Sequence, residues 1–263
     1  MIFVKLGGSL ITHKDASESA RLDVLQRLAS ELRLALDTDP ALRILLGHGS
    51  GSFGHDAAPR HGTHRGASTP AEWSGFAEVW AVANRLNRMV IDTLRAAGLP
   101  ALSIPPSASA MCDNGELIAL ASDPILHAIQ AGLLPVVAGD VAFDRRRGST
   151  IVSTERVFSF LAPRLKPTRV LLAGIEPGVY SDYPDNTQLL PTLSEAELEA
   201  IRVDNASTPD VTGGMADKVR HALGLVAAQP GLEVLIFSGE QPGLLTAALL
   251  GAAPGTRVIR SAD

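Results

Sequence analysis

A glycine-rich segment that follows a buried strand constrains the fold of this chain more than any other feature. The apolar run 42–46 is typical of a buried strand, and it leads into Gly47-His48-Gly49-Ser50-Gly51-Ser52-Phe53-Gly54-His55. Glycines at alternate positions let the backbone turn tightly and approach a ligand closely. The freed N–H groups and the hydroxyls of Ser50 and Ser52 favour an anion. The segment predicts either an anion cradle with His55 at its far end or a plain strand-to-helix turn.

The composition indicates one α/β unit, or two closely packed lobes, with a mostly aliphatic core. Of the 263 residues, 46% are hydrophobic and only 4% aromatic, and the net charge is −5. The absence of a basic block argues against a nucleic-acid surface, so we expect any phosphate site to be a local cluster of lysines and N–H groups. The single cysteine, Cys112, excludes an intrachain disulfide and suits a reducing compartment. With no signal-peptide pattern and no apolar run of membrane-spanning length, we expect a cytoplasmic protein.

Hydrophobic periodicity predicts strands that alternate with helices, which is typical of a mainly parallel sheet. We expect strands at 2–6, 42–46, 101–104, 133–138, 168–173, 233–237 and 257–259, a hairpin over 141–152, and helices at 19–37, 71–97, 122–131, 155–165, 194–201 and 241–250. Residues 56–70 are expected to form a mobile loop. Asp140 follows a predicted strand, at the end where open α/β sheets bind ligands. His61 and His64 have the spacing of a metal pair, but no nearby Cys or carboxylate completes a ligand set, so no metal site is expected.

Two further glycine loops lie towards the ends of the chain. Lys5-Leu6-Gly7-Gly8-Ser9 lacks the P-loop spacing, yet it leaves N–H groups free for phosphate oxygens, with Lys5 and Lys14 on either side. Asp210-Val211-Thr212-Gly213-Gly214-Met215 precedes Lys218 at a predicted helix N-terminus, which is again typical of a phosphate site. Ser153-Thr154-Glu155 is interpreted as the N-cap of the next helix.

The predicted helix 71–97 carries both tryptophans of the chain. Trp73, Phe76, Val79 and Trp80 lie along one side of it. Ordinary core packing explains such a stripe as well as an apolar substrate pocket beside the glycine turn does, so both interpretations stay open.

The order of the three loops, Lys-x-Gly-Gly-Ser, a Gly/Ser cradle ending in His, and Thr-Gly-Gly-Met-x-x-Lys, resembles the amino acid kinase superfamily over essentially the whole chain. Gly-Ser-Phe-Gly-His, Ile104-Pro105-Pro106-Ser107, Gly-Asp-Val at 139–141 and Asp-Val-Thr-Gly-Gly-Met look like the isopentenyl phosphate kinases within it. The resemblance implies an α/β three-layer sandwich, with an open, mainly parallel sheet between helices. It also implies an acceptor lobe at 1–165 and an ATP lobe at 166–263 within one compact unit.

The resemblance also implies that the protein is a homodimer and that it uses ATP and Mg²⁺ as cofactors, with Mg²⁺ held mainly through the nucleotide phosphates. It further implies roles for individual residues. His55 would hold the acceptor monophosphate, Lys14 would stabilise the transferred phosphoryl group, and Lys5 would serve both catalysis and ATP binding. Binding of the acceptor would involve Ser50, His55, Thr154 and Asp140. Binding of ATP would involve Lys5, Gly7, Gly8, Ser9, Gly51, Ile175, Gly178, Gly214 and Lys218.

The residues themselves support a phosphate acceptor. Transfer to a phosphate monoester brings two polyanions together, so lysines and Mg²⁺ are needed more than a strong base. The chain departs from the family pattern at Gly49-Ser50-Gly51, at Ser153-Thr154-Glu155 and at Gly174-Ile175-Glu176-Pro177-Gly178. Two alternatives therefore stay open: a kinase of another small phosphate or phosphonate, such as a fosfomycin-type antibiotic kinase, and a non-catalytic nucleotide sensor of the same fold.

Overall fold

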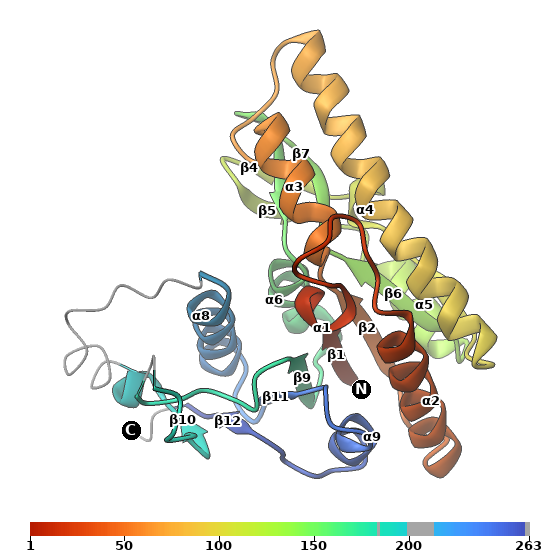
Figure 1. Ribbon diagram of the computed structural model, residues 1–263, viewed down its shortest axis with the longest axis vertical. Helices are drawn as coiled ribbons and strands as arrows, with labels where there is room; N and C mark the ends of the chain where they lie inside the picture. Colours follow the sequence, from red (N-terminus) through yellow and green to blue (C-terminus); the bar gives the residue numbers. More distant parts are fainter. Residues whose placement is uncertain (183–184, 199–212, 261–263) are drawn as a thin grey trace.

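Short, mostly apolar segments form the eight strands of a main sheet in the computed structural model (Figure 1). The structure describes residues 1–182, 185–198 and 213–260 and, within these ranges, all side chains except those at 55, 56 and 216. Neighbouring strands are parallel except for the pair β11–β12. The order across the sheet is β10 (Thr192–Leu193), β12 (Thr256–Val258), β11 (Glu233–Ser238), β9 (Arg169–Gly174), β1 (Ile2–Leu6), β2 (Ile44–His48), β6 (Leu134–Ala138) and β3 (Ala101–Ser103). The predicted open, mainly parallel sheet is confirmed.

Alternate side chains of the strands point to opposite faces of this sheet, and each face is covered by helices. Val4 of β1 joins one core cluster and Phe3 joins the other. The Val4 cluster includes residues of α1 (Gly8–Ile11), α2 (Leu22–Thr38), α3 (Gly51–His61), α4 (Pro70–Ala96) and α9 (Leu244–Leu249). The Phe3 cluster includes residues of α5 (Asp123–Gln130), α6 (Thr154–Leu165) and α8 (Gly213–Ala228). The predicted three-layer sandwich is therefore confirmed.

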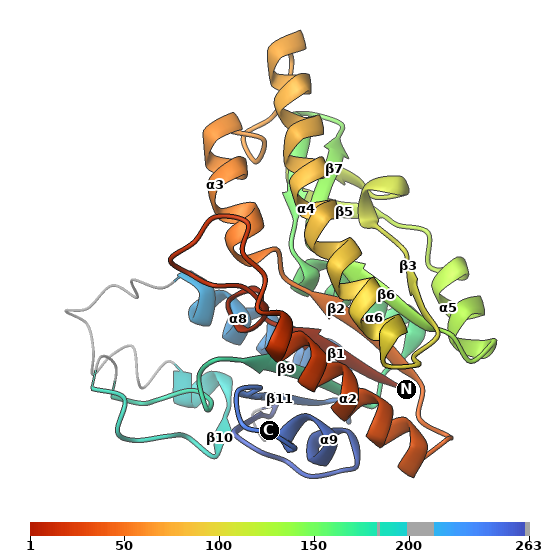
Figure 2. The same cartoon turned by 45° about the vertical axis from the view of Figure 1, so that its right-hand side comes forward.

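A second, smaller sheet lies beside α3 and α4 (Figure 2). Its strand order is β5 (Glu116–Ala119), β4 (Met111–Asp113), β7 (Asp140–Asp144) and β8 (Gly148–Val152), and the short 3-10 helix η1 (Pro106–Ala108) precedes it in the chain. The carboxylate of Asp144 accepts N–H groups of Asn114 (3.1 Å) and Gly115 (2.6 Å), which fixes the two hairpins to each other. Cys112 is fully buried here, and burial raises the pKa of its thiol to about 11, which fits the packing role expected of it.

The expected mobile loop at 56–70 is wrong for 56–61, which are helical, and a loop does follow over 62–69. Helix α3 continues to His61, and the following loop is attached to the β7–β8 hairpin. The N–H of Ala67 donates to the carbonyl of Arg147 (2.9 Å), and the hydroxyl of Ser149 donates to the carbonyl of Thr63 (3.0 Å). Gly51, Gly54 and Pro59 concealed the helix, because they are poor helix formers. Packing of Phe53 and Ala57 in the core compensates for their low helix propensity. The other expected strands and helices begin and end within a few residues of their expected bounds, except that the end of the expected helix 194–201 lies outside the described residues. The sequence did not predict α1, β4, β5 or β10.

Helix α2 joins the first half of the chain to the last (Figures 1 and 2). Glu31 is buried and its carboxylate accepts the N–H of Leu245 (3.0 Å) at the start of α9. Arg21 forms an ion pair with Glu240, and its guanidinium also donates to the carbonyl of Leu10 (3.2 Å). These contacts, with the shared main sheet, connect the proposed lobes. None of the helices in the described ranges combines the length and the apolar composition needed to cross a bilayer.

Candidate active site

The residues that follow the strands of the main sheet meet at its carboxyl edge. Each of four glycines donates its N–H to the carbonyl at the end of a neighbouring strand. The bonds are Gly139 to His48 (3.1 Å), Gly49 to Leu6 (3.0 Å), Gly7 to Ala173 (2.8 Å) and Gly239 to Gly174 (2.8 Å). The first glycine loop and the glycine-rich segment after β2, which lie far apart in the sequence, are therefore adjacent at one edge, where α/β sheets bind ligands.

The first glycine loop and the cradle touch backbone to backbone. A Cβ on Gly49 would lie 2.8 Å from the N atom of Gly8, and a Cβ on Gly8 would lie 2.7 Å from the Cα of Gly51. Gly51 also has a φ of +48°, in the left-handed region that favours glycine. Ser50, where the family usually has glycine, has an ordinary helical backbone, so this departure requires no strain. Only residues without a side chain allow the two loops to be this close.

Lys5 lies at the end of β1 with its ammonium group hydrogen-bonded to the carboxylate of Glu155, in the first turn of α6. Both side chains are largely buried. Burial opposes ionisation of Glu155, but the charge and hydrogen bond of Lys5 outweigh it and hold the pKa of Glu155 below its usual value. The sequence suggested a helix N-cap for this segment and a role of Thr154 in acceptor binding, and Ser153 does accept the N–H of Arg156 (3.2 Å). The ion pair of Glu155 with Lys5 is a feature of the candidate site that sequence reasoning missed.

Lys218, one turn into α8, comes to the same edge. A Cβ on Gly174 would lie 3.5 Å from its Nζ. Burial lowers the pKa of Lys218, and the charges of Lys5 and Lys14 lower it further, against Glu155 and Glu176. Lys14 itself is exposed, in the loop after α1. Of the three predicted lysines, Lys5 is buried at the sheet edge, Lys218 is half-buried beside it and Lys14 is in solvent.

Two of the residues predicted to bind the acceptor, Thr154 and Asp140, form hydrogen bonds with other parts of the protein. The hydroxyl of Thr154 donates to the carbonyl of His48 (2.7 Å), and its methyl group fills the space that a Cβ on Gly47 would need. The carboxylate of Asp140 accepts the N–H of Ser107 (3.1 Å), and burial raises its pKa. Both contacts orient the cradle and the Ile-Pro-Pro-Ser segment, and direct binding of the acceptor by either side chain stays a prediction.

The ATP residues predicted near the C-terminal lobe are only partly described. The carbonyl of Ile175 accepts the hydroxyl of Ser238 (2.7 Å). Gly178 is packed against Thr256, whose hydroxyl accepts the N–H of Val179 (2.8 Å). Hydroxyl groups of Ser238 and Thr256 therefore fix the loop 174–178, which departs from the family pattern. The sequence of the loop alone does not indicate these contacts.

Three predicted features lie partly or wholly outside the described residues. They are the His55 side chain, whose backbone is in the first turns of α3, the residues 210–212, and the surroundings of Gly214 at the start of α8. Gly7, Gly8 and Ser9 are described: Gly7 precedes α1, and Gly8 and Ser9 form its first turn. Their contacts with ATP stay predictions.

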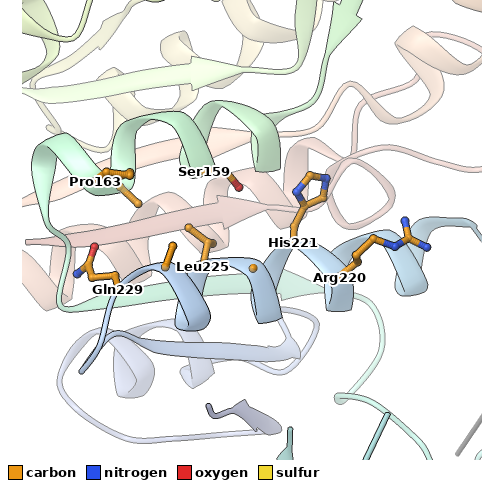
Figure 3. A pocket seen from close by; sticks show the side chains of 9 residues that line it. Ser159, Pro163, Arg220, His221, Leu225 and Gln229 are labelled. Carbon is orange, nitrogen blue, oxygen red and sulfur yellow. The ribbon is translucent and has the colours of Figure 1, made fainter. Parts of the chain in front are cut away.

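A groove of about 220 Å³ runs between α6 and α8 (Figure 3). Ser159 of α6 and His221 of α8 line it together with apolar side chains and with Arg220 and Gln229. Burial lowers the pKa of His221, while the charge of Glu155 raises it. No sequence pattern indicates this groove, because its residues come from two helices that are adjacent only in the fold.

Comparison with known proteins decides the family of the chain. The amino acid kinase family model matches residues 1–238. Isopentenyl phosphate kinase of Methanothermobacter thermautotrophicus is 36% identical over 98% of this chain and 98% of its own length. The chain belongs to the amino acid kinase family. Isopentenyl phosphate kinase of Haloferax volcanii is 34% identical, over 99% of this chain and 98% of its own length. A crystal structure of isopentenyl phosphate kinase superposes with a TM-score of 0.82 and 32% identity, covering 98% of this chain and 99% of that one.

Proposed function

We propose that this protein is an isopentenyl phosphate kinase, which transfers the γ-phosphoryl group of ATP to isopentenyl phosphate and yields isopentenyl diphosphate for isoprenoid biosynthesis. The observation that carries this function is the backbone contact between Gly8 and Gly51, which places the two phosphate loops side by side. Lys5 and Lys218 lie at the same edge. Two adjacent anion sites with shared lysines fit a donor and an acceptor that both carry phosphate.

The chemistry follows from the charges of the two substrates. An oxygen of the acceptor phosphate attacks the γ-phosphorus, and the bond from that phosphorus to the β,γ-bridging oxygen breaks, so that ADP leaves. The acceptor oxygen is largely deprotonated at neutral pH, since the second pKa of a phosphate monoester is about 6, and no strong base is needed. In this proposal Lys5 and Lys218 bind the phosphates of ATP, Lys14 stabilises the transferred group and His55 donates a hydrogen bond to the acceptor.

Mg²⁺ completes the proposal as a charge-neutralising partner of ATP. Within the described ranges no three His, Cys, Asp or Glu side chains lie together as a ligand set. The donor groups at the loops are backbone N–H groups and lysines, which suit phosphate oxygens and not a cation. These residues fit a metal that is bound mainly through the nucleotide.

The apolar tail of the acceptor is assigned to an aromatic cluster on α4 and β7. The ring of Phe143 lies 5.2 Å from that of Phe76 and 6.0 Å from that of Trp73, centroid to centroid. Of the other two residues in the predicted stripe, Val79 is buried in the core and Trp80 is 43% exposed. Trp73 and Phe76 are distinguished from the rest of the stripe by their ring contacts with Phe143, and these three rings are the part assigned to a substrate wall.

The proposal includes a cytoplasmic homodimer. Strand β3 forms one edge of the main sheet, and its Leu102 is 45% exposed. An edge strand can pair with another chain, and a second copy is the partner that this family suggests. Light scattering on the purified protein tests this arrangement: a mass of one chain would contradict it.

A panel of acceptors tests the function. ATP turnover is measured with isopentenyl phosphate, with fosfomycin, with other small monophosphates and without acceptor, and phosphorus NMR identifies the product. We expect ADP and isopentenyl diphosphate to form in equal amounts. Turnover with the phosphonate alone would favour the antibiotic kinase, and ATP binding without turnover on any acceptor would favour the sensor.

A further inference from the structure

Thr12 is buried directly after α1, and its hydroxyl connects two parts of the site that lie far apart in the sequence. The hydroxyl donates to the carbonyl of Gly8 (2.8 Å), in the first glycine loop. The same oxygen accepts the N–H of Ser52 (3.0 Å), in the first turn of α3. The side chain is 2% exposed, so water does not compete for these bonds.

The bond to Ser52 does the work of a missing helix cap. Helix α3 begins after Ser50, and the side chain of Ser50 makes no capping hydrogen bond. The first N–H groups of a helix need partners from outside the helix. Thr12 supplies one of them from another segment, and it lies against Gly51, where a Cβ would collide with its hydroxyl oxygen. The start of the cradle that is proposed to bind the acceptor is therefore positioned by Thr12, which follows α1. The first glycine loop, residues 5–9, is called the nucleotide loop below, because ATP is proposed to bind there.

The backbone of Thr12 also fixes the loop that carries Lys14. Thr12 pairs with Ala20 in an isolated antiparallel bridge. The N–H of His13 donates to the carbonyl of Ser19 (2.9 Å), which closes the loop between them. One residue thus contacts the nucleotide loop, the acceptor cradle and the base of the Lys14 loop.

We propose that Thr12 is a positioning residue that sets the alignment of the donor and acceptor phosphates. Phosphoryl transfer needs the attacking oxygen and the leaving oxygen in line, so a small shift between two well-formed sites lowers the rate without emptying either of them. A hydroxyl that donates and accepts at once fixes both loops, and an isosteric methyl group can do neither. This inference rests on the proposed kinase function.

The test compares Thr12→Val and Thr12→Ser with Thr93→Val as the matched control. Thr93 makes the same type of bond, from its hydroxyl to the carbonyl of Met89 (2.8 Å), on α4 and away from the loops. We expect Thr12→Val to lower kcat by about 10- to 100-fold, with the Kd of ATP and of isopentenyl phosphate each changed less than about threefold in calorimetry. Thr12→Ser is expected to keep kcat within about threefold of the parent.

Each outcome distinguishes a role of Thr12 in aligning the two phosphates from a role only in the stability of the fold. An unchanged kcat in Thr12→Val overturns the proposal, as does a loss of kcat in Thr12→Ser equal to that in Thr12→Val. If Thr12→Val does not fold, Thr12→Cys replaces it, because a thiol of similar size is a weak donor and acceptor. We then expect the Thr12→Cys variant to have a lower kcat than the Thr12→Ser variant while both Kd values are kept, and a parental kcat in Thr12→Cys overturns the proposal.

The proposed function can fail separately from this inference. If the parent protein phosphorylates another acceptor, the same variants are measured with that acceptor, and the expected division between kcat and Kd is unchanged. If the parent binds ATP and transfers no phosphoryl group to any acceptor, both the kinase function and the alignment role of Thr12 are wrong.

Discussion

The ammonium group of Lys5 and the carboxylate of Glu155 form a hydrogen-bonded ion pair between residues 150 positions apart in the chain. Their side chains are only 10% and 11% exposed. A buried pair gives little net stability over an apolar pair, but removal of one partner leaves an uncompensated buried charge. The pair thus links the end of β1 to the start of α6 at the place where ATP phosphates are proposed to bind.

Glu155→Gln is expected to destabilise the fold by about 3–5 kcal/mol at pH 7, because it leaves Lys5 buried without a counter-charge. The pKa of Glu155 is below its usual value of 4.5, so the pair contributes fully above that pH and its contribution is lost as the pH falls through the folded pKa. Urea unfolding between pH 3 and 7 measures both effects, with the exposed Glu195→Gln as control. Parallel stability curves for the Glu155→Gln variant and the parent would contradict this assignment.

Lys14→Ala is expected to lower kcat by about 10²–10³-fold, the scale of one lost electrostatic group in a transition state. The side chain is exposed, so the fold should tolerate the change. Steady-state kinetics with both substrates measure it, and Lys166→Asn is the control for a lost surface lysine, since residue 166 has a φ of +48° that Asn tolerates. A parental kcat would remove Lys14 from the mechanism.

Phe143→Ala and Phe76→Ala are expected to shift the acceptor preference towards longer prenyl phosphates. Each additional buried CH₂ of the substrate contributes about 0.8 kcal/mol, or about fourfold in kcat/KM, when there is space for it. Trp80→Ala serves as control, because Trp80 lies on the same helix as Phe76 and is not part of the ring cluster of Trp73, Phe76 and Phe143. Competition between acceptors of different length gives the profile. The same preference in both Phe variants and the parent would exclude the aromatic cluster as the substrate wall.

His55→Gln is expected to retain more activity than His55→Ala, because an amide keeps an N–H donor at similar reach. Both changes should weaken binding of isopentenyl phosphate and leave ATP binding nearly intact, since ATP is assigned to Lys5 and Lys218. Titration calorimetry with each ligand measures this. Loss of ATP binding with the acceptor affinity preserved would mean that the two phosphate sites are assigned in the wrong order.

The sequence predicted the main sheet well because its strands are mostly apolar segments, such as β1, β2 and β6, in which every residue is buried. It failed at α3, where Gly54 and Pro59 lie inside a helix that packing in the core supports. Local preference is a weak guide where tertiary contacts outweigh it.

The candidate site likewise contains residues that the sequence could predict and residues that it could not. Glycine loops have local signatures, so Gly8, Gly49 and Gly51 could be selected from spacing alone, and the structure shows why a side chain would not fit there. The partners of these loops have no such signature. Thr12 and Glu155 are an ordinary threonine and an ordinary first-turn acid until the fold brings Ser52 and Lys5 to them.

The contact of α2 with α9 has a consequence for how the chain is made. Glu31 is synthesised early, yet the N–H groups of Leu245 and Thr246 that its carboxylate accepts emerge from the ribosome much later, after separations of 214 and 215 positions. Until α9 is synthesised, the carboxylate of Glu31 and the face of α2 that packs against α9 are exposed to solvent or make transient contacts. Completion of the first lobe therefore waits for the last helix, and we expect chains shortened before residue 244 to stay dependent on chaperones.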